Sequence, residues 1–180
     1  IADAHCIIDA PIEALRVFEK AKGKIDFLIM NGDIPDHSGE IENFDTIYEI
    51  VGRITEGNIP TVFSRGNHDT RGVYAENIAE FTPCENGNSY FTFRLGKLWG
   101  IVIDCGEDKP DNHPVYAGFV AFDEYGMEQV EWLKGVLKSK AFRKAKNRIV
   151  MLHIPPAVEA MKEQNEKQVA SMLEWHGNAH

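Results

Sequence analysis

Side chains of the kinds that bind metal ions or transfer protons recur at intervals along this sequence. Most of them directly follow a short apolar run. In chain order they are Asp3 and His5, Asp33 and Asp36, Asn67 and His68, and His153. Carboxylates, imidazoles and amide carbonyls are suitable ligands for first-row transition metals, and carboxylates and imidazoles also act as general acids and bases. Because the carboxyl ends of parallel strands meet at one crevice, we expect these groups to lie close together.

Each of these groups also has a purely structural interpretation. Asp3 and His5 would suit a helix N-cap or a surface turn, and the Gly-Asp-x-x-Asp stretch that starts at Gly32 would suit an Asx turn after a strand. His153 would suit a core histidine bonded to the backbone. The Gly-Asn-His-Asp stretch that starts at Gly66 follows a buried strand and is flanked by arginines, which a simple turn does not require. The recurrence of such groups after successive strands favours a functional site.

The elements that must position these groups alternate between helix and strand. Apolar residues at helical spacing predict three helices, one ending near Gly23 and the others over residues 44–54 and 130–137. Short apolar runs predict five strands, at residues 27–30, 61–63, 90–93, 98–103 and 148–152. Residues 105–122 lack periodicity, which predicts a long loop. Parallel βα units followed by a hairpin predict two sheets packed between helices.

Composition and charge limit the class of protein. A chain of 180 residues with 43% hydrophobic and 26% charged residues is typical of a soluble globular protein and fits one domain over residues 1–180. The formal charge of −9 argues against a nucleic-acid-binding surface, because a polyanion would be repelled over most approaches. It is compatible with a small phosphate substrate beside bound cations. We find no apolar run of the roughly 18 residues that a membrane span needs.

Taken in order, these motifs resemble those of the calcineurin-like metallophosphoesterases. They are Asp-x-His at residues 3–5, Gly-Asp-x-x-Asp at 32–36, Gly-Asn-His-Asp at 66–69 and a lone histidine at 153. The segments that look closest to the purple-acid-phosphatase-like branch are 90–93, 104–108 and 153–156. The resemblance implies an α/β fold, an αββα sandwich of two mixed sheets flanked by helices. It also implies a metal-dependent hydrolase that acts on small-molecule phosphate mono- or diesters.

The resemblance further implies which residues hold the metal ions. Asp3 and His5 would bind a first ion, Asp33 would bridge two ions, and Asn67 and His153 would bind the second. Such mixed nitrogen and oxygen ligands suit Mn, Fe or Zn, as divalent or trivalent ions. A hydroxide held between the two ions would then attack phosphorus in line.

Four more residues take part in this expectation. His68 would be the general acid that protonates the leaving group, and Asp36 would be the carboxylate that raises its pKa. Arg71 would contact a phosphate oxygen as a forked donor, although a solvated arginine or a partner of Asp69 is an alternative. His176 would face the substrate, with a surface histidine as the alternative.

The sequence departs from the family pattern near its end. The pattern closes with Gly-His-x-His, and the nearest string here is Gly-Asn-Ala-His at residues 177–180. We therefore expect the domain to be truncated at both ends, without its first strand and its Gly-His-x-His region. The missing ligands give some weight to a second hypothesis, a metallophosphoesterase-fold scaffold that binds metal or a partner protein without turnover. The intact His68 argues against it, because a scaffold needs no general acid.

Overall fold

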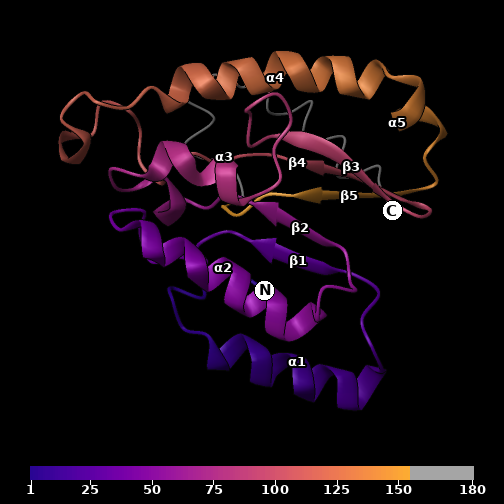
Figure 1. Ribbon diagram of the computed structural model, residues 1–180. Helices are drawn as coiled ribbons and strands as arrows, with labels where there is room; N and C mark the ends of the chain where they lie inside the picture. Colours follow the sequence, from indigo (N-terminus) through magenta and orange to yellow (C-terminus); the bar gives the residue numbers. More distant parts are fainter. Residues whose placement is uncertain (155–180) are drawn as a thin grey trace.

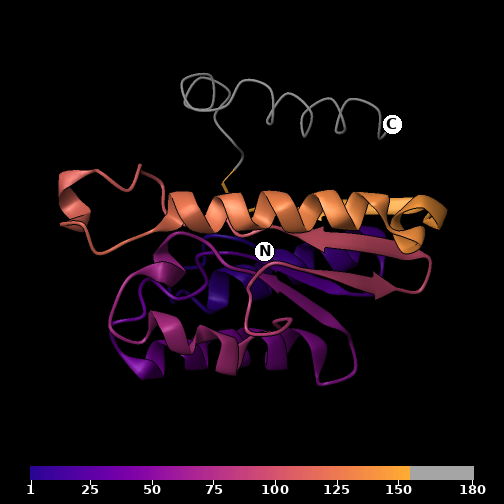
Figure 2. The ribbon, with the colours of Figure 1, turned by 90° about the horizontal axis from the view of Figure 1, so that it is seen from above.

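Helices lie on the two outer sides of the molecule, and two sheets lie between them (Figure 1). This computed structural model describes residues 1–154. Helices α1 (Asp9–Lys22) and α2 (Asp45–Thr55) cover the first sheet, and α4 (Phe122–Lys138) and α5 (Lys140–Lys144) cover the second. Seen from above, α4 runs along the length of the second sheet (Figure 2). The predicted α/β arrangement of two sheets flanked by helices is confirmed.

The two sheets differ in the direction of their strands. In the first, β1 (Leu28–Asn31) and β2 (Thr61–Ser64) pair in parallel. The second has the order β3 (Phe91–Leu95), β4 (Leu98–Val102) and β5 (Asn147–Met151). There β3 is antiparallel and β5 parallel to β4. The second sheet is thus mixed, as predicted, whereas the first is parallel over its two described strands.

The first residues of the chain extend the first sheet. The amino group of Ile1 donates to the carbonyl of Ile29 over 2.9 Å, and the amide of Asn31 donates to the carbonyl of Ile1 over 2.6 Å. This alternation is that of a parallel ladder. The amide of Asp3 then donates to the carbonyl of Gly32, just beyond the end of β1. The ladder therefore delivers Asp3 to the same end of the sheet as the residues that follow β1.

The core beneath the first sheet comes from an apolar stripe on α2. Ile47, Ile50 and Ile54 recur at helical spacing, and all three are buried. They pack in one cluster with Met30 and Phe44. Full burial of one such side chain stabilises the fold by about 1.5–3 kcal/mol, so this cluster anchors β1 and the loop that follows it.

Strand β4 contributes to two further cores. Alternate side chains of a strand point to opposite faces, and here both faces are covered. Val102 packs between the sheets, against Val62 of β2. Ile101 faces the other way and packs with Leu133 of α4 and Phe142 of α5. Burial on both faces explains the continuous apolar run that predicted this strand.

The structure adds short elements that the sequence patterns do not predict. The segment expected to be a long loop contains the turn η4 and ends where α4 begins. The added elements are α3 (Ile78–Phe81), α5, η1 (Ile41–Phe44), η2 (His68–Thr70), η3 (Ala75–Asn77) and η4 (Pro114–Tyr116). None of the helices within residues 1–154 combines the length and apolar character needed to cross a bilayer.

The α2 stripe generates a stability prediction. Ile50 is fully buried, so Ile50→Ala removes apolar contacts and leaves a cavity, and we expect it to lower the free energy of unfolding by about 2–5 kcal/mol. The same change at Ile7, which is 57% exposed, is the matched control and should cost less than about 1 kcal/mol. Urea unfolding followed by circular dichroism measures both. Equal losses in the two variants would contradict the placement of Ile50 in the core.

Candidate metal centre

The carboxyl ends of β1, β2 and β5 meet, and each is followed by a candidate ligand. Asp33 follows β1, Asn67 follows β2 and His153 follows β5. A hydrogen bond of 3.3 Å from Asn31 Nδ2 to the carbonyl of Leu152 joins the ends of β1 and β5 across the two sheets. The strand arrangement therefore gathers these side chains at one edge, where ligands bind in open α/β sheets.

His153 has the hydrogen-bonding pattern of a metal-binding histidine. Its Nδ1 lies 2.7 Å from the carbonyl oxygen of Asn31, so Nδ1 carries the proton and donates it there. The lone pair of Nε2 then faces Asp33 Oδ2 at 3.2 Å and Asp3 Oδ1 at 4.0 Å. Three acceptors that face one another repel unless a proton or a metal cation lies between them. Histidine ligands commonly donate their second ring N–H to a backbone carbonyl in this way, so the donor set fits a bound metal ion.

Two adjoining groups of side chains that could hold a metal ion share His5. Asp3, His5 and Asp33 each offer one ligand atom, and these atoms lie within 4.8 Å of one another; the same holds for His5, Asp36 and His68. His5 Nδ1 lies 3.0 Å from Asp36 Oδ1 and donates to it, which leaves Nε2 of His5 free to act as a ligand. All of these are nitrogen or carboxylate oxygen donors, the set that suits Mn, Fe or Zn.

Asn67 lies at the start of the η2 turn and is buried. Although it occupies the N-cap position, its side chain makes no capping hydrogen bond. A buried side-chain amide that makes no capping hydrogen bond has a carbonyl oxygen available as a metal ligand. This is consistent with the ligand role expected from the sequence, which stays a prediction.

The backbone is strained where it carries these ligands. Asp3, His5 and Asp33 have φ values of 53°, 43° and 54°, in the left-handed region that residues other than glycine rarely adopt. The amide of His5 donates to the carbonyl of Asp33 over 3.1 Å, which helps to hold two of these residues in place. Such conformations cost about 1–3 kcal/mol each and concentrate at functional sites.

Two glycines of the sequence motifs allow the loops to approach each other. A Cβ atom on Gly32 would lie 2.6 Å from the ring of His153, and one on Gly66 would collide with the Asp33 carboxylate. Gly32 also has a φ of +80°, which favours glycine on its own account. The glycines that precede the Asp and Asn of these motifs are therefore required for the ligands to meet.

Asp69, the last residue of the Gly-Asn-His-Asp motif, links the loop after β1 to the loop after β2 through hydrogen bonds. Its Oδ2 accepts the amide hydrogens of Asp33, at 3.0 Å, and Gly66, at 2.8 Å. Burial raises the pKa of this carboxyl to about 7. Its Oδ1 has no hydrogen-bond partner among residues 1–154. Asp69 therefore positions the loop that carries Asn67.

His68 lies beside the candidate ligands, and both of its ring nitrogens have polar contacts. Nδ1 donates to the backbone carbonyl of Asp36 over 2.8 Å, and Nε2 lies 3.0 Å from Arg71 Nη1. The carboxylate of Asp36 lies 3.8 Å from His68 Nδ1 and is closer to His5. Asp36 thus orients His68 mainly through its carbonyl oxygen, and the expected action of its carboxylate on the pKa of His68 stays a prediction.

Arg71 is paired, but not with Asp69. Its Nε and Nη2 donate to Glu107, with a shortest distance of 2.9 Å, and Nη2 also reaches Asp108 at 3.2 Å. Hydrogen bonding to Glu107 raises the pKa of the guanidinium above its ordinary value, which keeps it charged. Nη1 remains directed at His68. The pair with Asp69, one alternative considered from the sequence, is therefore replaced by pairs with Glu107 and Asp108.

A buried ion pair behind the site joins the ends of β2 and β4. Arg65 Nη2 lies 2.7 Å from Asp104 Oδ2, and Asp104 is fully buried. Ser89 donates to the same oxygen, and Gln129 of α4 accepts the amide hydrogen of Asp104. Sequence reasoning assigned no role to Arg65, Asp104 or Glu107. The available signal was their position, because each lies just after an apolar run, as the candidate ligands do.

One candidate residue falls outside the described part of the chain. His176 and the Gly-Asn-Ala-His string at residues 177–180 lie beyond residue 154. Their expected roles stay predictions.

Comparison with known proteins agrees with the motifs and the fold. The chain belongs to the calcineurin-like phosphoesterase family, whose profile matches residues 1–178. The human protein named serine/threonine-protein phosphatase CPPED1 is 26% identical over 160 residues, which are 86% of this chain and 48% of that protein. The Bos taurus protein of the same name is 24% identical over 159 residues, with the same shares.

The chain therefore spans about half the length of these two curated relatives. Membership of the family, inferred above from the spacing of the motifs, is confirmed. The closer resemblance to the purple-acid-phosphatase-like branch stays a prediction.

The geometry around Asp33 generates a metal-binding prediction. Asp33→Asn keeps the shape of the side chain and its acceptor for the His68 amide, but it removes the negative charge. We expect Mn²⁺ at about 100 times its Kd to raise the free energy of unfolding of the wild type by about 2.7 kcal/mol, and to raise that of Asp33→Asn far less. Thermal unfolding with and without Mn²⁺ measures this.

The matched control for this experiment is Asp9→Asn, the same chemical change on a side chain that is 96% exposed. It should retain the full response to Mn²⁺. The same response in Asp33→Asn would show that the ion binds elsewhere.

Proposed function

We propose that this chain hydrolyses phosphate mono- or diesters at the carboxyl ends of β1, β2 and β5, with His68 as the general acid. The observation that carries this proposal is the position of His68 beside the candidate ligands. Its amide donates to Asp33 Oδ1 over 2.9 Å, and its ring lies 4.6 Å from that of His5. A proton donor adjacent to a metal-type donor set is the arrangement that phosphoester hydrolysis requires.

The residues present would hold two metal ions. Asp3 and His5 would bind one, Asn67 and His153 the other, and the buried carboxylate of Asp33 would bridge them. Bound there, the ions would supply a hydroxide nucleophile near neutral pH and offset the negative charge of the phosphate. Mn, Fe and Zn match these donors.

His68 and Arg71 would act together on the phosphate group. His68 donates its Nδ1 proton to a backbone carbonyl, which turns Nε2 toward Arg71. Nε2 and Arg71 Nη1 lie 3.0 Å apart, so both can reach oxygens of one phosphate. In the protonated state, His68 would donate from Nε2 to the leaving oxygen. Glu107 would hold the rest of the guanidinium in place.

The names of the two relatives extend the range of candidate ester substrates. Both are named serine/threonine-protein phosphatases, so phosphoserine and phosphothreonine esters join small-molecule phosphate esters as candidate substrates here. All of these contain an anionic phosphate group, dianionic in monoesters and monoanionic in diesters, that two cations and Arg71 would accommodate. A panel of monoesters, diesters and phosphopeptides, each assayed with Mn²⁺ and after chelation, distinguishes among them.

The general-acid role of His68 has a specific kinetic consequence. We expect His68→Ala to lower turnover by about 10² to 10⁴ while Mn²⁺ binding, measured by calorimetry, is unchanged. The loss should be greater for an alkyl phosphate than for p-nitrophenyl phosphate, because an alkoxide leaving group depends more on protonation. Removal of metal by a chelator should abolish activity on both substrates.

The matched control is His37→Ala, the same change at an exposed histidine. It should retain activity on both esters. Equal losses on the two esters in His68→Ala would remove His68 as the proton donor, and metal binding without turnover in the wild type would favour the scaffold hypothesis.

Arg71 should contribute to binding of the phosphate group. A hydrogen bond to a charged group contributes about 1.5–3 kcal/mol, so Arg71→Ala should lower kcat/KM by about 10- to 100-fold, mainly through KM. Arg53→Ala, a half-exposed arginine of α2, is the control and should leave both constants unchanged. Steady-state kinetics with p-nitrophenyl phosphate measures the effect. An unchanged KM in Arg71→Ala would show that this arginine pairs with Glu107 and does not bind the phosphate group.

A further inference from the structure

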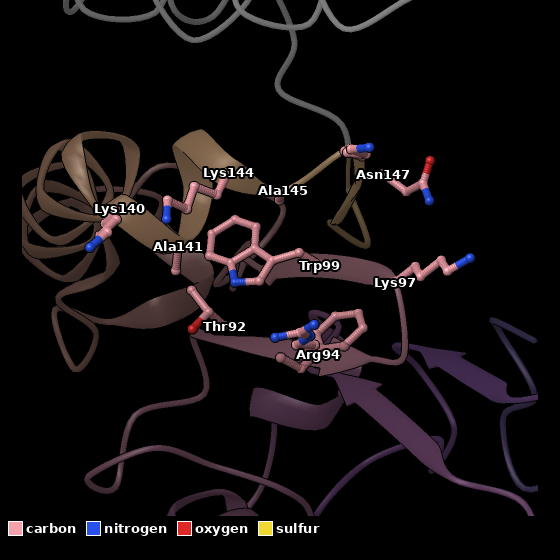
Figure 3. Close-up of a pocket in the computed structure, with 11 residues that line it drawn as sticks. Thr92, Arg94, Lys97, Trp99, Lys140, Ala141, Lys144, Ala145 and Asn147 are labelled. Carbon is pink, nitrogen blue, oxygen red and sulfur yellow. The ribbon is translucent and has the colours of Figure 1, made fainter.

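A groove with a volume of about 780 Å³ lies on the second sheet, away from the candidate metal centre. It is formed by the β3–β4 hairpin, α5 and the start of β5, and Trp99 lies in its floor (Figure 3). These segments lie at the opposite end of the strands from the carboxyl ends that carry the ligands (Figure 1). The groove is therefore separate from the site described above.

The groove is basic, although the chain carries a net charge of −9. Its lining contains no acidic residue and includes five exposed basic side chains, Arg94, Lys97, Lys140, Lys144 and Lys146. None of these five forms an ion pair with a carboxylate within residues 1–154, and the sequence from residue 132 to residue 150 contains no Asp or Glu. The charges of this groove are thus available to an anionic ligand.

The basic groove and the candidate metal centre lie at opposite ends of strand β5. Strand β5 begins at Asn147 in the groove and leads to His153 at the metal centre, a distance of roughly 20 Å at the rise of an extended chain. The carboxylates of the candidate ligands lie at the His153 end, where metal ions would neutralise their charge. At the groove, nothing within the described residues neutralises the positive charges, and this imbalance favours a negatively charged partner.

We propose that this groove binds an acidic segment of a partner protein. In Figure 3, Lys140 and Lys144 lie on one side of Trp99 and Lys97 lies on the other, so the ammonium groups are spread along the groove and do not converge on one point. A compact polyphosphate needs convergent donors. An extended peptide with several carboxylates matches cations that are spread out, and lysines accept carboxylates at varied angles because they are point charges.

Other polyanions fit the groove less well. Single-stranded nucleic acids stack their bases on exposed aromatic rings, whereas Trp99 is only 9% exposed. A lipid bilayer presents a broad surface, and juxtamembrane basic segments act across that surface, whereas this basic face is concave.

Fluorescence polarisation of a labelled peptide tests the proposal on the full chain. The probe is a peptide of about ten residues rich in Glu and Asp, long enough when extended to span the groove, and its counterpart has Gln and Asn at the same positions. We expect only the acidic peptide to bind, and its affinity should fall as the salt concentration is raised from about 0.05 to 0.3 M. Equal binding of the two peptides would overturn the proposal.

Charge reversal locates the binding surface. The triple variant Lys140→Glu, Lys144→Glu and Lys146→Glu should weaken binding of the acidic peptide about tenfold or more, because three attractive contacts become repulsive. The matched control reverses three exposed lysines near the end of α1, Lys20, Lys22 and Lys24, and should bind as the wild type does. Thermal unfolding checks that both variants are folded.

A second variant, Arg94→Glu with Lys97→Glu on the hairpin, tests the other side of the groove and should also weaken binding. Undiminished binding in both groove variants would contradict the proposal. An oligothymidylate or vesicles containing phosphatidylserine should bind less tightly than the peptide. If either bound more tightly and lost affinity in the groove variants, the partner class proposed here would be wrong.

Discussion

The buried carboxylate of Asp33 is the interaction on which the rest of this site depends. It accepts the amide hydrogen of His68 with one oxygen and faces His153 Nε2 with the other. Because the second nitrogen of His153 is already bonded to the backbone, a negative charge and a lone pair are held face to face. A buried, unpaired charge costs several kcal/mol, so this arrangement favours a metal cation between the two groups or a proton on Nε2. The geometry is thus compatible with the proposed metal site.

Bringing these ligand atoms together requires backbone conformations that are unfavourable on their own. Left-handed conformations at Asp3, His5 and Asp33 and the close approach at Gly32 and Gly66 all serve to bring ligand atoms together. The cores under the two sheets and the buried carboxyl of Asp69 offset that strain. The strained backbone therefore lies next to packed cores and a buried hydrogen-bonded carboxyl, which limit the movement of the ligand side chains.

The sequence predicted the main strands and helices because their apolar residues are either continuous or regularly spaced, and the parallel topology then predicted that Asp33, Asn67 and His153 would meet. Finer contacts depend on loop paths and side-chain rotamers that no local pattern encodes. The backbone carbonyl of Asp36 accepts a hydrogen bond from His68, and Glu107, in a long loop, accepts one from Arg71. Helix α5 is too short for periodicity to reveal. The sequence did not reveal the basic groove because the net charge sums over the whole chain and says nothing of where the charges lie.

The most direct test of this account is anomalous diffraction at the manganese absorption edge, from crystals of the full chain grown with Mn²⁺. The account predicts an anomalous peak within coordination distance of both the Asp33 carboxylate and His153 Nε2, with a second peak on the side of Asp3 and His5. An ordered site without any peak between Asp33 and His153, or manganese bound only elsewhere, would contradict it.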